Sequence, residues 1–447
     1  MVGLIFIGLF KLAIWSSGHQ APIWKEPELT KDNKKQEPVK GDTTLLGVYG
    51  KKKIVIPNNM KHLFICGTTG SGKTVTLSNF IDSIFKYDYP ALIVDGKGDT
   101  GLGSILDYIT RYKRQYPHKL VYVINLNSPE TSDSYNPFHN KQVTVIKDML
   151  ISMTDWSEEH YKVNASRYIQ KVIYLMQANG IALTFSNIIE HLDKSAFTRL
   201  SLALQKQKKI TKQIHLDNVN MAESVAKIVE GTVARFALLA ESDIGMLFTD
   251  DGIDIPTALN EKAIILFVLN PLVYPEMSPL FGRLITIDAK QGVSSLFHKR
   301  FSRTFYLFDE VSIYMSRDLL LLVNLSRSAN ITSILATQSL SDLDSVDESL
   351  RKQIIESCNN YIVMRQNEPS NAEVWATTLG TRNTIDMTYQ VKKSRDTRDN
   401  TGLGTAKIVK EFLYHPDIIK NLKTGEAIYM SKDLNIHYQI KVHKPNI

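Results

Sequence analysis

Short apolar runs alternate with amphipathic segments in the part of the chain that follows a polar stretch at residues 19–43. Residues 45–57 (LLGVYGKKKIVIP) predict a β-hairpin that turns at the lysines. Residues 62–66 (HLFIC) form an apolar run that ends in glycines, and residues 75–85 place apolar side chains on one helical face. Further strand-like runs follow at residues 91–94 and 120–126. This alternation predicts an α/β fold, with a mainly parallel sheet flanked by helices.

The pattern changes between residues 142 and 247, where no strong strand-like run occurs. The segment is helical in pattern, with polar interruptions such as Asn179-Gly180. Strand-like runs return at residues 263–269, 304–308, 331–337, 361–364 and 427–430. The simplest organisation is one α/β domain formed by residues 44–141 and 248–447, with an all-α insert at residues 142–247.

The N-terminus carries an apolar run, VGLIFIGLFKLAIW at residues 2–15, that only Lys11 interrupts. The run is shorter than the about 20 residues of a membrane-spanning helix. A polar linker follows at residues 19–43, with five lysines and three prolines. Two interpretations stay open for residues 1–18. One is a membrane anchor, which the positive-inside rule orients with the rest of the chain in the cytoplasm, and the other is a helix buried against protein.

The composition narrows the class of protein. A length of 447 residues corresponds to about three domains at roughly 150 residues each. Hydrophobic residues make up 43% and charged residues 22%, which excludes a disordered, collagen-like or polytopic membrane protein. Two cysteines exclude a disulfide scaffold. The net charge of +7, from 53 basic and 46 acidic side chains, permits a polyanionic partner without requiring one.

Residues 67–74 (GTTGSGKT) match the phosphate-binding pattern G-x-x-x-x-G-K-[ST] at every fixed position. A strand-like run precedes the motif and a helical pattern follows it, as a phosphate loop requires. Glycines let backbone N–H groups approach phosphate oxygens. Lys73 is expected to neutralise the β- and γ-phosphates, and the Thr74 hydroxyl to coordinate Mg²⁺. We predict that ATP contacts every residue of the loop: Gly67, Thr68, Thr69, Gly70, Ser71, Gly72, Lys73 and Thr74.

A second glycine pattern, at residues 96–101 (GKGDTG), matches G-x-G-x-x-G after a strand-like run. A lone match of this kind is weak, and the phosphate loop already occupies the first strand–helix turn, where a dinucleotide motif belongs. We interpret residues 95–99 (DGKGD) as a loop beside the nucleotide, with Asp95 and Lys97 as candidate contacts. The alternative is a plain turn.

Residues 304–310 (TFYLFDE) form an apolar run that ends in two carboxylates. In P-loop enzymes an aspartate at the end of such a strand binds Mg²⁺, and an adjacent glutamate polarises the attacking water. We therefore predict Asp309 as a metal ligand with Thr74, and Glu310 as the residue that activates water. The alternative is a strand that simply ends in solvated acids, which is the weaker interpretation beside a phosphate loop.

Residues 331–338 (ITSILATQ) repeat this design with Gln338 at the polar end. A glutamine there is expected to sense the γ-phosphate or orient water, and the alternative is a mere strand-terminal amide. Arg327 lies just before the run. It is a candidate arginine finger that completes the site of a neighbouring subunit, and the alternative is a surface arginine at a helix end.

An ordered set of motifs resembles the conjugative coupling proteins of type IV secretion systems, the TraD/TraG type, within the FtsK/HerA class of DNA-pumping ATPases. The set comprises GTTGSGKT (67–74), DGKGD (95–99), SYNPF (134–138), FDE (308–310), RSANITSILATQS (327–339) and KTGEAIYM (423–430). The resemblance covers about residues 45–435. It implies a RecA-like P-loop ATPase that uses ATP and Mg²⁺.

The resemblance also implies roles for single residues. Lys73 and Thr74 would bind phosphate and magnesium, Asp309 magnesium, Glu310 would activate water, Gln338 would sense the γ-phosphate, and Arg327 would act in trans within a hexameric ring. The all-α insert would engage a relaxase or other DNA-processing proteins, and the protein would dock on a secretion channel at the cytoplasmic face of the bacterial inner membrane. Family members carry two N-terminal membrane helices, whereas this chain has at most one short segment, so a cytoplasmic location is the alternative.

Binding of DNA by a translocase rests mainly on charge and is independent of sequence. Two basic patches are candidates, and a solvated surface is the alternative for each. They are Lys206, Lys208, Lys209 and Lys212 in the insert, and Lys392, Lys393, Arg395 and Arg398 in a polar loop. No sequence-reading motif is evident.

We expect an ATP-driven DNA translocase that delivers relaxase-bound DNA to a type IV secretion channel. Two alternatives stay open. One is a DNA-pumping ATPase of the same fold that acts in repair, segregation or plasmid maintenance. The other is an ATP-switched adaptor that recruits secreted protein substrates through its helical insert.

Overall fold

The computed structural model describes residues 41–153, 156, 158–296, 303–393 and 398–446. The described residues fall into two compact units. One unit contains Lys35–Trp375 and Pro416–Ile447, and the other includes Ala376–His415. The predicted membrane anchor at residues 2–15 lies outside the described residues.

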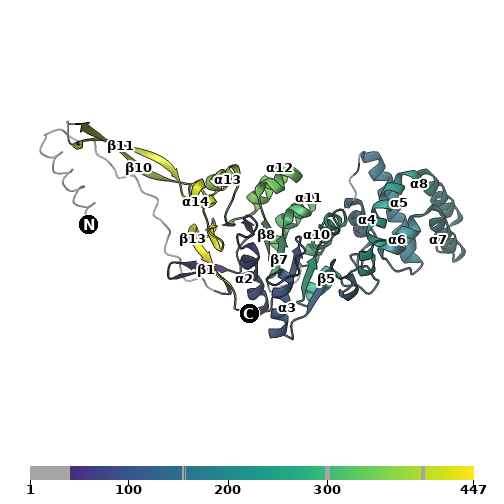
Figure 1. Ribbon diagram of the computed structural model, residues 1–447. Helices are drawn as coiled ribbons and strands as arrows, with labels where there is room; N and C mark the ends of the chain where they lie inside the picture. Colours follow the sequence, from purple (N-terminus) through teal and green to yellow (C-terminus); the bar gives the residue numbers. More distant parts are fainter. Residues whose placement is uncertain (1–40, 154–155, 157, 297–302, 394–397, 447) are drawn as a thin grey trace. The chain divides into compact units, whose positions relative to one another are not determined.

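Eleven strands in the described part of the first unit form a single sheet, in the order β2-β1-β13-β12-β9-β3-β8-β7-β4-β6-β5 (Figure 1). The strands are β1 (Thr43–Tyr49), β2 (Lys52–Pro57), β3 (Leu63–Cys66), β4 (Ala91–Asp95), β5 (Val121–Asn125), β6 (Ile264–Val268), β7 (Thr304–Asp309), β8 (Ile331–Thr337), β9 (Asn360–Val363), β12 (Glu426–Ser431) and β13 (Ile436–Val442). Neighbouring strands from β9 to β5 pair in parallel, whereas β12, β13, β1 and β2 add an antiparallel edge.

Helices cover both faces of this sheet. They are α2 (Lys73–Lys86), α3 (Ile105–Gln115), α9 (Ile255–Asn260), α10 (Met277–Leu296), α11 (Arg317–Ser326), α12 (Leu340–Ser357), α13 (Pro369–Leu379) and α14 (Pro416–Lys420). Buried side chains of α2 and α3 share a core with one side of the strands. On the other side, Phe281 of α10 packs against Phe267 of β6, with ring centroids 5.8 Å apart. The predicted α/β fold with a mainly parallel, helix-flanked sheet is confirmed.

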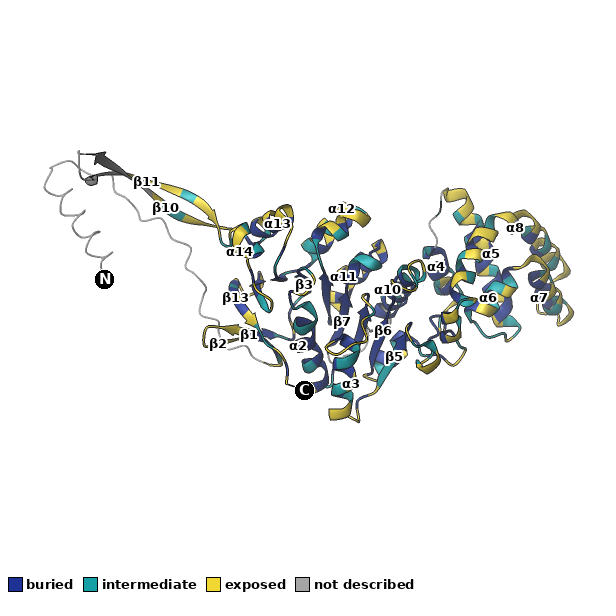
Figure 2. Cartoon of the chain, in the orientation of Figure 1, coloured by how far each residue is buried: buried dark blue, intermediate teal, exposed yellow. Residues whose placement is uncertain are grey.

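The order of the strands decides where the polar strand ends lie. β8 lies between β3 and β7, and β4 lies on the other side of β7. These strands run in parallel, so their carboxyl ends meet at one edge of the sheet. In the observed register Asp95 stands opposite Asp309, and Cys66 stands opposite Thr337. The strands themselves are buried, as Figure 2 shows, whereas the polar side chains predicted to carry the chemistry stand at that edge.

A group of helices occupies the range predicted for the all-α insert. They are α4 (Val143–Ser152), α5 (Glu159–Ala178), α6 (Phe185–Leu192), α7 (Lys194–Lys206) and α8 (Lys212–Ala240), followed by the 3₁₀ helix η2 (Asp243–Leu247). No strand occurs among the described residues from 142 to 247. The exact boundaries of an insert domain stay a prediction.

The two chain segments that connect the sheet to these helices pair with each other. Tyr135 forms an isolated parallel bridge with Ile253, and the Asn136 N–H donates to the Ile253 carbonyl over 2.9 Å. A Cβ atom on Gly252 would lie 2.5 Å from the Tyr135 carbonyl carbon, so only glycine fits there. The SYNPF motif therefore marks the place where the chain leaves the sheet.

The second unit contains a long antiparallel pair, β10 (Thr381–Lys393) and β11 (Arg398–Phe412). The prediction that Lys392, Lys393 and Arg398 lie in a polar loop is wrong, because all three lie within these strands. Arg395 lies outside the described residues. The segment is rich in threonine and charged residues and lacks an apolar run, so its strands give little hydrophobic signal.

Among the described residues, no helix has both the length and the apolar character needed to cross a membrane.

Candidate nucleotide-binding site

The phosphate loop joins β3 to α2 at the carboxyl edge of the sheet. Gly70 and Gly72 have φ angles of +74° and +112°, which favour glycine. A Cβ atom on Gly67 would lie 2.5 Å from the Cβ of Met364, so the backbone approaches its neighbour too closely for any side chain. The three glycines thus serve the shape of the loop itself.

Two neighbouring strands hold the start of the loop. The Gly67 N–H donates to the Thr337 carbonyl at the end of β8, over 3.3 Å. The Thr68 N–H donates to the Arg365 carbonyl, just beyond β9, over 3.0 Å. These bonds fix the loop to the parallel sheet on both sides.

Lys73 is the first residue of α2, and its Nζ donates to the Gly67 carbonyl over 2.6 Å. Burial lowers the pKa of Lys73, and the carboxylates of Glu310 and Asp309 oppose that shift. The ammonium group therefore lies over the loop and in the field of the acidic strand end. Thr74 follows in the first turn of α2, where a hydroxyl can meet a cation bound beside the phosphates.

Asp309 and Asp95 form a buried carboxylate pair on adjacent strands, with 4% and 2% of each residue exposed. Burial and the charges of Asp95 and Glu310 raise the pKa of Asp309 well above its ordinary value. One carboxylate oxygen of Asp309, Oδ1, is buried without a hydrogen-bond partner. A buried anionic oxygen without a donor is suited to a cation.

The ligand set suits magnesium. No group of three or more His, Cys, Asp or Glu side chains suitable for a metal occurs in the part of the chain that the structure describes. Mg²⁺ needs no such cage, because it keeps several waters and takes one or two protein oxygens plus phosphate oxygens. Asp309 and Thr74 therefore fit the predicted ion.

The loop after β4 is held by Asp95. Its Oδ1 accepts from the N–H groups of Lys97 (2.9 Å) and Gly98 (3.2 Å). The Lys97 side chain is exposed, and its charge contributes to lowering the pKa of Lys73. Asp95 thus shapes the loop, while direct nucleotide contacts by Asp95 and Lys97 stay a prediction.

Glu310 follows Asp309 and has a φ angle of +49°, an uncommon conformation for a residue with a side chain. Its Oε1 accepts from the Gln338 N–H (3.2 Å) and from the Ser312 hydroxyl (3.3 Å). Such strained backbone persists where the surroundings fix it, and it is enriched at functional sites. The carboxylate is therefore held in one orientation beside the end of β8.

Gln338 joins the acidic strand end to the phosphate loop. Its Oε1 accepts from the Thr69 hydroxyl over 2.7 Å, while its backbone N–H donates to Glu310. The structure thereby brings the phosphate loop, Asp309, Glu310 and Gln338 together at one edge of the sheet.

Arg327 lies elsewhere. It begins the 3₁₀ helix η4 (Arg327–Ala329), just before the amino end of β8, and its side chain is exposed. The seven residues of β8 span about 23 Å, at about 3.3 Å per residue, so Arg327 is at the edge of the sheet opposite its own phosphate loop. Burial, helped by the charge of Arg327, lowers the pKa of His62 to about 4. Arg327 is thus absent from the site of its own chain.

Two contacts of the site could not be predicted from the sequence. Met364 packs under Gly67 and accepts from the Ser71 hydroxyl, with its Sδ 3.7 Å from Ser71 Oγ. Ser312 helps to hold Glu310. Met364 follows Gly67 by 297 positions in the sequence, and no local sequence pattern predicts such a contact.

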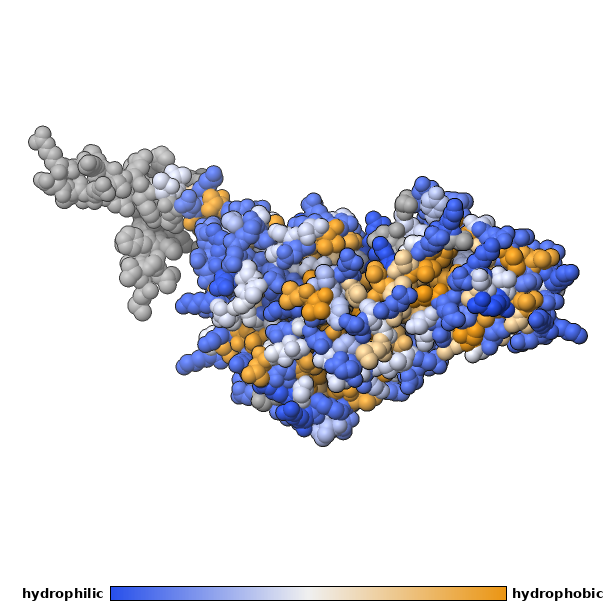
Figure 3. Space-filling view, turned by 45° about the vertical axis from the view of Figure 1, so that its right-hand side comes forward, coloured by the Kyte–Doolittle hydropathy of each residue, from blue (hydrophilic) through white to orange (hydrophobic). Residues whose placement is uncertain are grey.

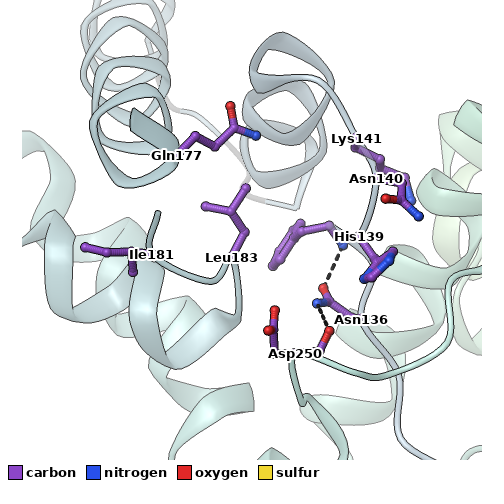
Figure 4. A pocket seen from close by; sticks show the side chains of 9 residues that line it. Asn136, His139, Asn140, Lys141, Gln177, Ile181, Leu183 and Asp250 are labelled. Atoms are coloured by element: carbon purple, nitrogen blue, oxygen red, sulfur yellow. Dashed lines mark hydrogen bonds between the residues drawn. The ribbon is translucent and has the colours of Figure 1, made fainter. Parts of the chain in front are cut away.

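A separate cavity of about 300 Å³ lies between the helical region (residues 143–247) and the segments that connect it to the sheet (Figure 4). Asn136 lies in its wall and donates from Nδ2 to the Asp250 carbonyl over 3.3 Å. Lys141, also in the wall, forms a buried ion pair with Asp288 at 2.8 Å. No residue of the phosphate loop lines this cavity, so it is distinct from the candidate nucleotide site.

The sequence matches the family described as the type IV secretion-system coupling protein DNA-binding domain over residues 50–442. The chain belongs to this family. The resemblance inferred from the motifs is thereby confirmed. No curated protein matches the sequence.

Several solved structures share the fold of the chain. The conjugative coupling protein TrwBdeltaN70 in its unbound monoclinic form has a TM-score of 0.63 at 14% identity, covering 92% of this chain and 90% of that one. TrwB with ADP and Mg²⁺ has a TM-score of 0.57 at 15% identity, covering 86% of each chain. VirB4 of Thermoanaerobacter pseudethanolicus has a TM-score of 0.54 at 11% identity, covering 91% of this chain and 97% of that one.

Proposed function

We propose that this coupling protein family member is an ATP-driven DNA translocase that delivers relaxase-bound DNA to a type IV secretion channel. The observation that carries the proposal is the linked arrangement at the carboxyl edge of the sheet. There Gln338 bonds both to Glu310 and to the Thr69 hydroxyl of the phosphate loop. A residue so placed can relate the state of the phosphates to the group that activates water.

Hydrolysis of ATP follows from the roles of these residues. The loop N–H groups and Lys73 would hold the phosphate oxygens, as helix N-termini and glycine-rich loops do. Mg²⁺, held by Thr74 and Asp309, would neutralise charge on the phosphates. Glu310, fixed by the Gln338 N–H and the Ser312 hydroxyl, would accept a proton from the attacking water.

Solved relatives support nucleotide and metal as cofactors. TrwB has been solved with the non-hydrolysable ATP analogue ADPNP and with ADP and Mg²⁺. Because these chains are only 14% and 15% identical to this one, the likeness concerns the fold, and the cofactors are carried over as part of the proposal.

A ring of subunits, which we propose to be a hexamer, would complete the site with Arg327 from a neighbour. Leu321 and Leu325 support such a contact, because they lie one helical turn apart on α11, directly before Arg327, and are 47% and 48% exposed. Exposed apolar side chains that lie side by side are suited to a contact with another protein surface. Figure 3 shows hydrophobic residues interspersed with hydrophilic ones on one face of the molecule.

DNA would be held through its backbone. The family description names a DNA-binding domain, and the net charge of +7 suits a polyanion. Lys206, Lys208 and Lys212 are exposed around the junction of α7 and α8 and are candidates for such contacts. Lys209 is the weaker candidate, because its Nζ donates to the Ala178 carbonyl over 3.0 Å.

Attachment to the cytoplasmic face of the inner membrane would come from residues 2–15, whose apolar character motivates this part of the proposal. Cell fractionation of the full chain and of a variant lacking residues 2–15 tests it. The full chain should enter the membrane fraction and the shortened chain should not.

Plasmid transfer in cells that lack their own coupling protein separates a motor from an adaptor. A motor requires hydrolysis, so Glu310→Gln should abolish transfer that the wild-type chain restores. If Glu310→Gln supports normal transfer while deletion of residues 142–247 abolishes it, the chain acts as a recruitment adaptor instead.

A further inference from the structure

A turn from the C-terminal part of the chain lies against the outside of the phosphate loop. It spans residues 423–426, which follow α14 and end at the first residue of β12. The Glu426 N–H donates to the Lys423 carbonyl over 2.9 Å, and the Lys423 N–H donates to the Glu426 carboxylate over 2.9 Å. Gly425, the third residue, has a φ angle of +79°, as in a type II turn. Two hydrogen bonds therefore close the turn, and they give it a defined shape.

This turn makes two hydrogen bonds to the phosphate loop. The Thr424 hydroxyl donates to the Gly70 carbonyl over 3.0 Å. The Gly425 N–H donates to the Ser71 carbonyl over 2.9 Å. Two successive carbonyl groups of the loop are thus held from outside by two successive residues of the turn.

Because the peptide bond is planar, the two hydrogen bonds to the loop carbonyls also determine the direction of the N–H groups that follow those carbonyls. In a trans peptide the carbonyl of one residue and the N–H of the next point in opposite directions. Holding the Gly70 and Ser71 carbonyls outward therefore turns the N–H groups of Ser71 and Gly72 inward. In line with this, the Ser71 N–H donates to the Thr68 carbonyl of the loop itself, over 3.1 Å.

The loop needs such support, because its glycines restrain the backbone little. A Cβ atom on Gly70 would meet nothing within 4 Å, so no side-chain packing fixes this residue. The turn, in contrast, is anchored to the sheet, since the Val442 N–H of β13 donates to the Gly425 carbonyl over 2.8 Å. The antiparallel edge of the sheet is thereby connected to the phosphate loop.

We propose that Thr424 and Gly425 are positioning residues that pre-orient the phosphate-binding N–H groups of the loop. The inference rests on the proposed binding of ATP and adds to it a support that residues 67–74 do not contain. When the donors are already oriented, binding of a phosphate does not include the free-energy cost of ordering them. Loss of the support should therefore weaken nucleotide binding rather than slow the chemical step.

The test replaces the Thr424 hydroxyl in the full chain. Thr424→Val removes the donor and keeps the branched shape, and Thr424→Ser keeps the donor. Thr110→Val is the matched control, because the exposed Thr110 also donates to a backbone carbonyl, that of Leu106, over 2.8 Å on α3. The measurements are the Kd of ADP with Mg²⁺ by calorimetry, and KM and kcat for ATP without DNA.

We expect Thr424→Val to raise the Kd of ADP and the KM of ATP about five-fold, the size of one lost hydrogen bond, with kcat changed less than two-fold. Thr424→Ser and Thr110→Val should bind ADP as the wild type does. A Thr424→Val chain with wild-type Kd and KM overturns the inference, as does a Thr424→Ser chain as impaired as Thr424→Val. A wild-type chain that binds no nucleotide overturns the proposed function itself, which distinguishes the two failures.

Discussion

The backbone N–H of Gln338 donates a hydrogen bond of 3.2 Å to the carboxylate of Glu310. The side chain of the same glutamine accepts from the Thr69 hydroxyl over 2.7 Å. One residue thus connects the group proposed to activate water with the loop proposed to bind phosphate. The proposed roles of Glu310, Gln338 and Thr69 can be tested by changing one residue at a time.

Glu310→Gln should lower kcat by about 10²–10⁴-fold, the usual contribution of a general base. Glutamine keeps an oxygen that can accept from the Gln338 N–H, so the Kd of ATP should change less than two-fold. Steady-state hydrolysis and calorimetry measure the two quantities. Glu130→Gln, at an exposed glutamate, is the control and should leave both unchanged. A Glu310→Gln chain with wild-type kcat would remove Glu310 from the mechanism.

Thr69→Val and Gln338→Ala should each slow hydrolysis, and the double variant should be no slower than the worse single variant. The reason is that each single change already breaks the same hydrogen bond. A double-mutant cycle on kcat measures the coupling, which should exceed about 0.5 kcal/mol. Strictly additive effects would show that the Thr69–Gln338 bond does not act during turnover.

Arg327→Ala should abolish hydrolysis by rings made of that variant alone, because each site would then lack the cation proposed to come from the neighbouring subunit. Mixing Arg327→Ala subunits with Glu310→Gln subunits should restore partial activity. In such rings an intact Glu310 site can receive Arg327 from the adjacent Glu310→Gln subunit. Hydrolysis after subunit exchange is the measurement, and mixtures as inactive as each parent would argue against action in trans.

The raised pKa of Asp309 predicts how the nucleotide-free chain responds to pH. Between the ordinary pKa of about 3.9 and the raised one, the folded chain holds a proton that the unfolded chain releases. The free energy of unfolding should therefore fall as pH rises through this window. In EDTA, Asp309→Asn should lose less Tm between pH 5 and pH 8 than the wild type, and Asp386→Asn, at an exposed carboxylate, should follow the wild type. Equal losses in the wild type and Asp309→Asn would contradict this account of the buried pair.

The buried ion pair of Lys141 and Asp288 should stabilise the junction between the sheet and the helical region. Asp288 is fully buried, and it also accepts from the Tyr135 hydroxyl over 2.8 Å. Asp288→Ala leaves the Lys141 charge uncompensated and should lower the free energy of unfolding by about 3–5 kcal/mol. Urea denaturation measures this. The double variant Lys141→Met, Asp288→Leu should recover part of the loss, and a double variant less stable than Asp288→Ala would contradict the electrostatic explanation.

Much of the sheet could be predicted because its central strands are buried on both faces and read as continuous apolar runs. β6 and β3 are examples, with every residue buried. The hairpin of β10 and β11 has no such run, and its charged residues suggested a loop instead. Helical periodicity similarly predicted the helices after residue 142, while the long-range packing that decides their limits has no local pattern.

The candidate site, too, could be predicted from the sequence only in part. The phosphate loop and the acidic strand end could be predicted because each is local in sequence. The order of the strands then brings Gln338 to Glu310, and sequence alone does not give that order. The contacts of Met364 and Thr424 with the loop escaped prediction, because they come from residues far away in sequence whose types are common anywhere in a chain.

DNA-stimulated ATP hydrolysis by the purified full-length chain is the most direct test of the central claim. The assay compares the rate without DNA, with single-stranded DNA and with double-stranded DNA, for the wild type and for Lys73→Ala. A DNA translocase should hydrolyse ATP several-fold faster with at least one form of DNA, and Lys73→Ala should hydrolyse none. A wild-type rate that neither form of DNA changes, or a Lys73→Ala chain that hydrolyses ATP at the wild-type rate, would contradict the account.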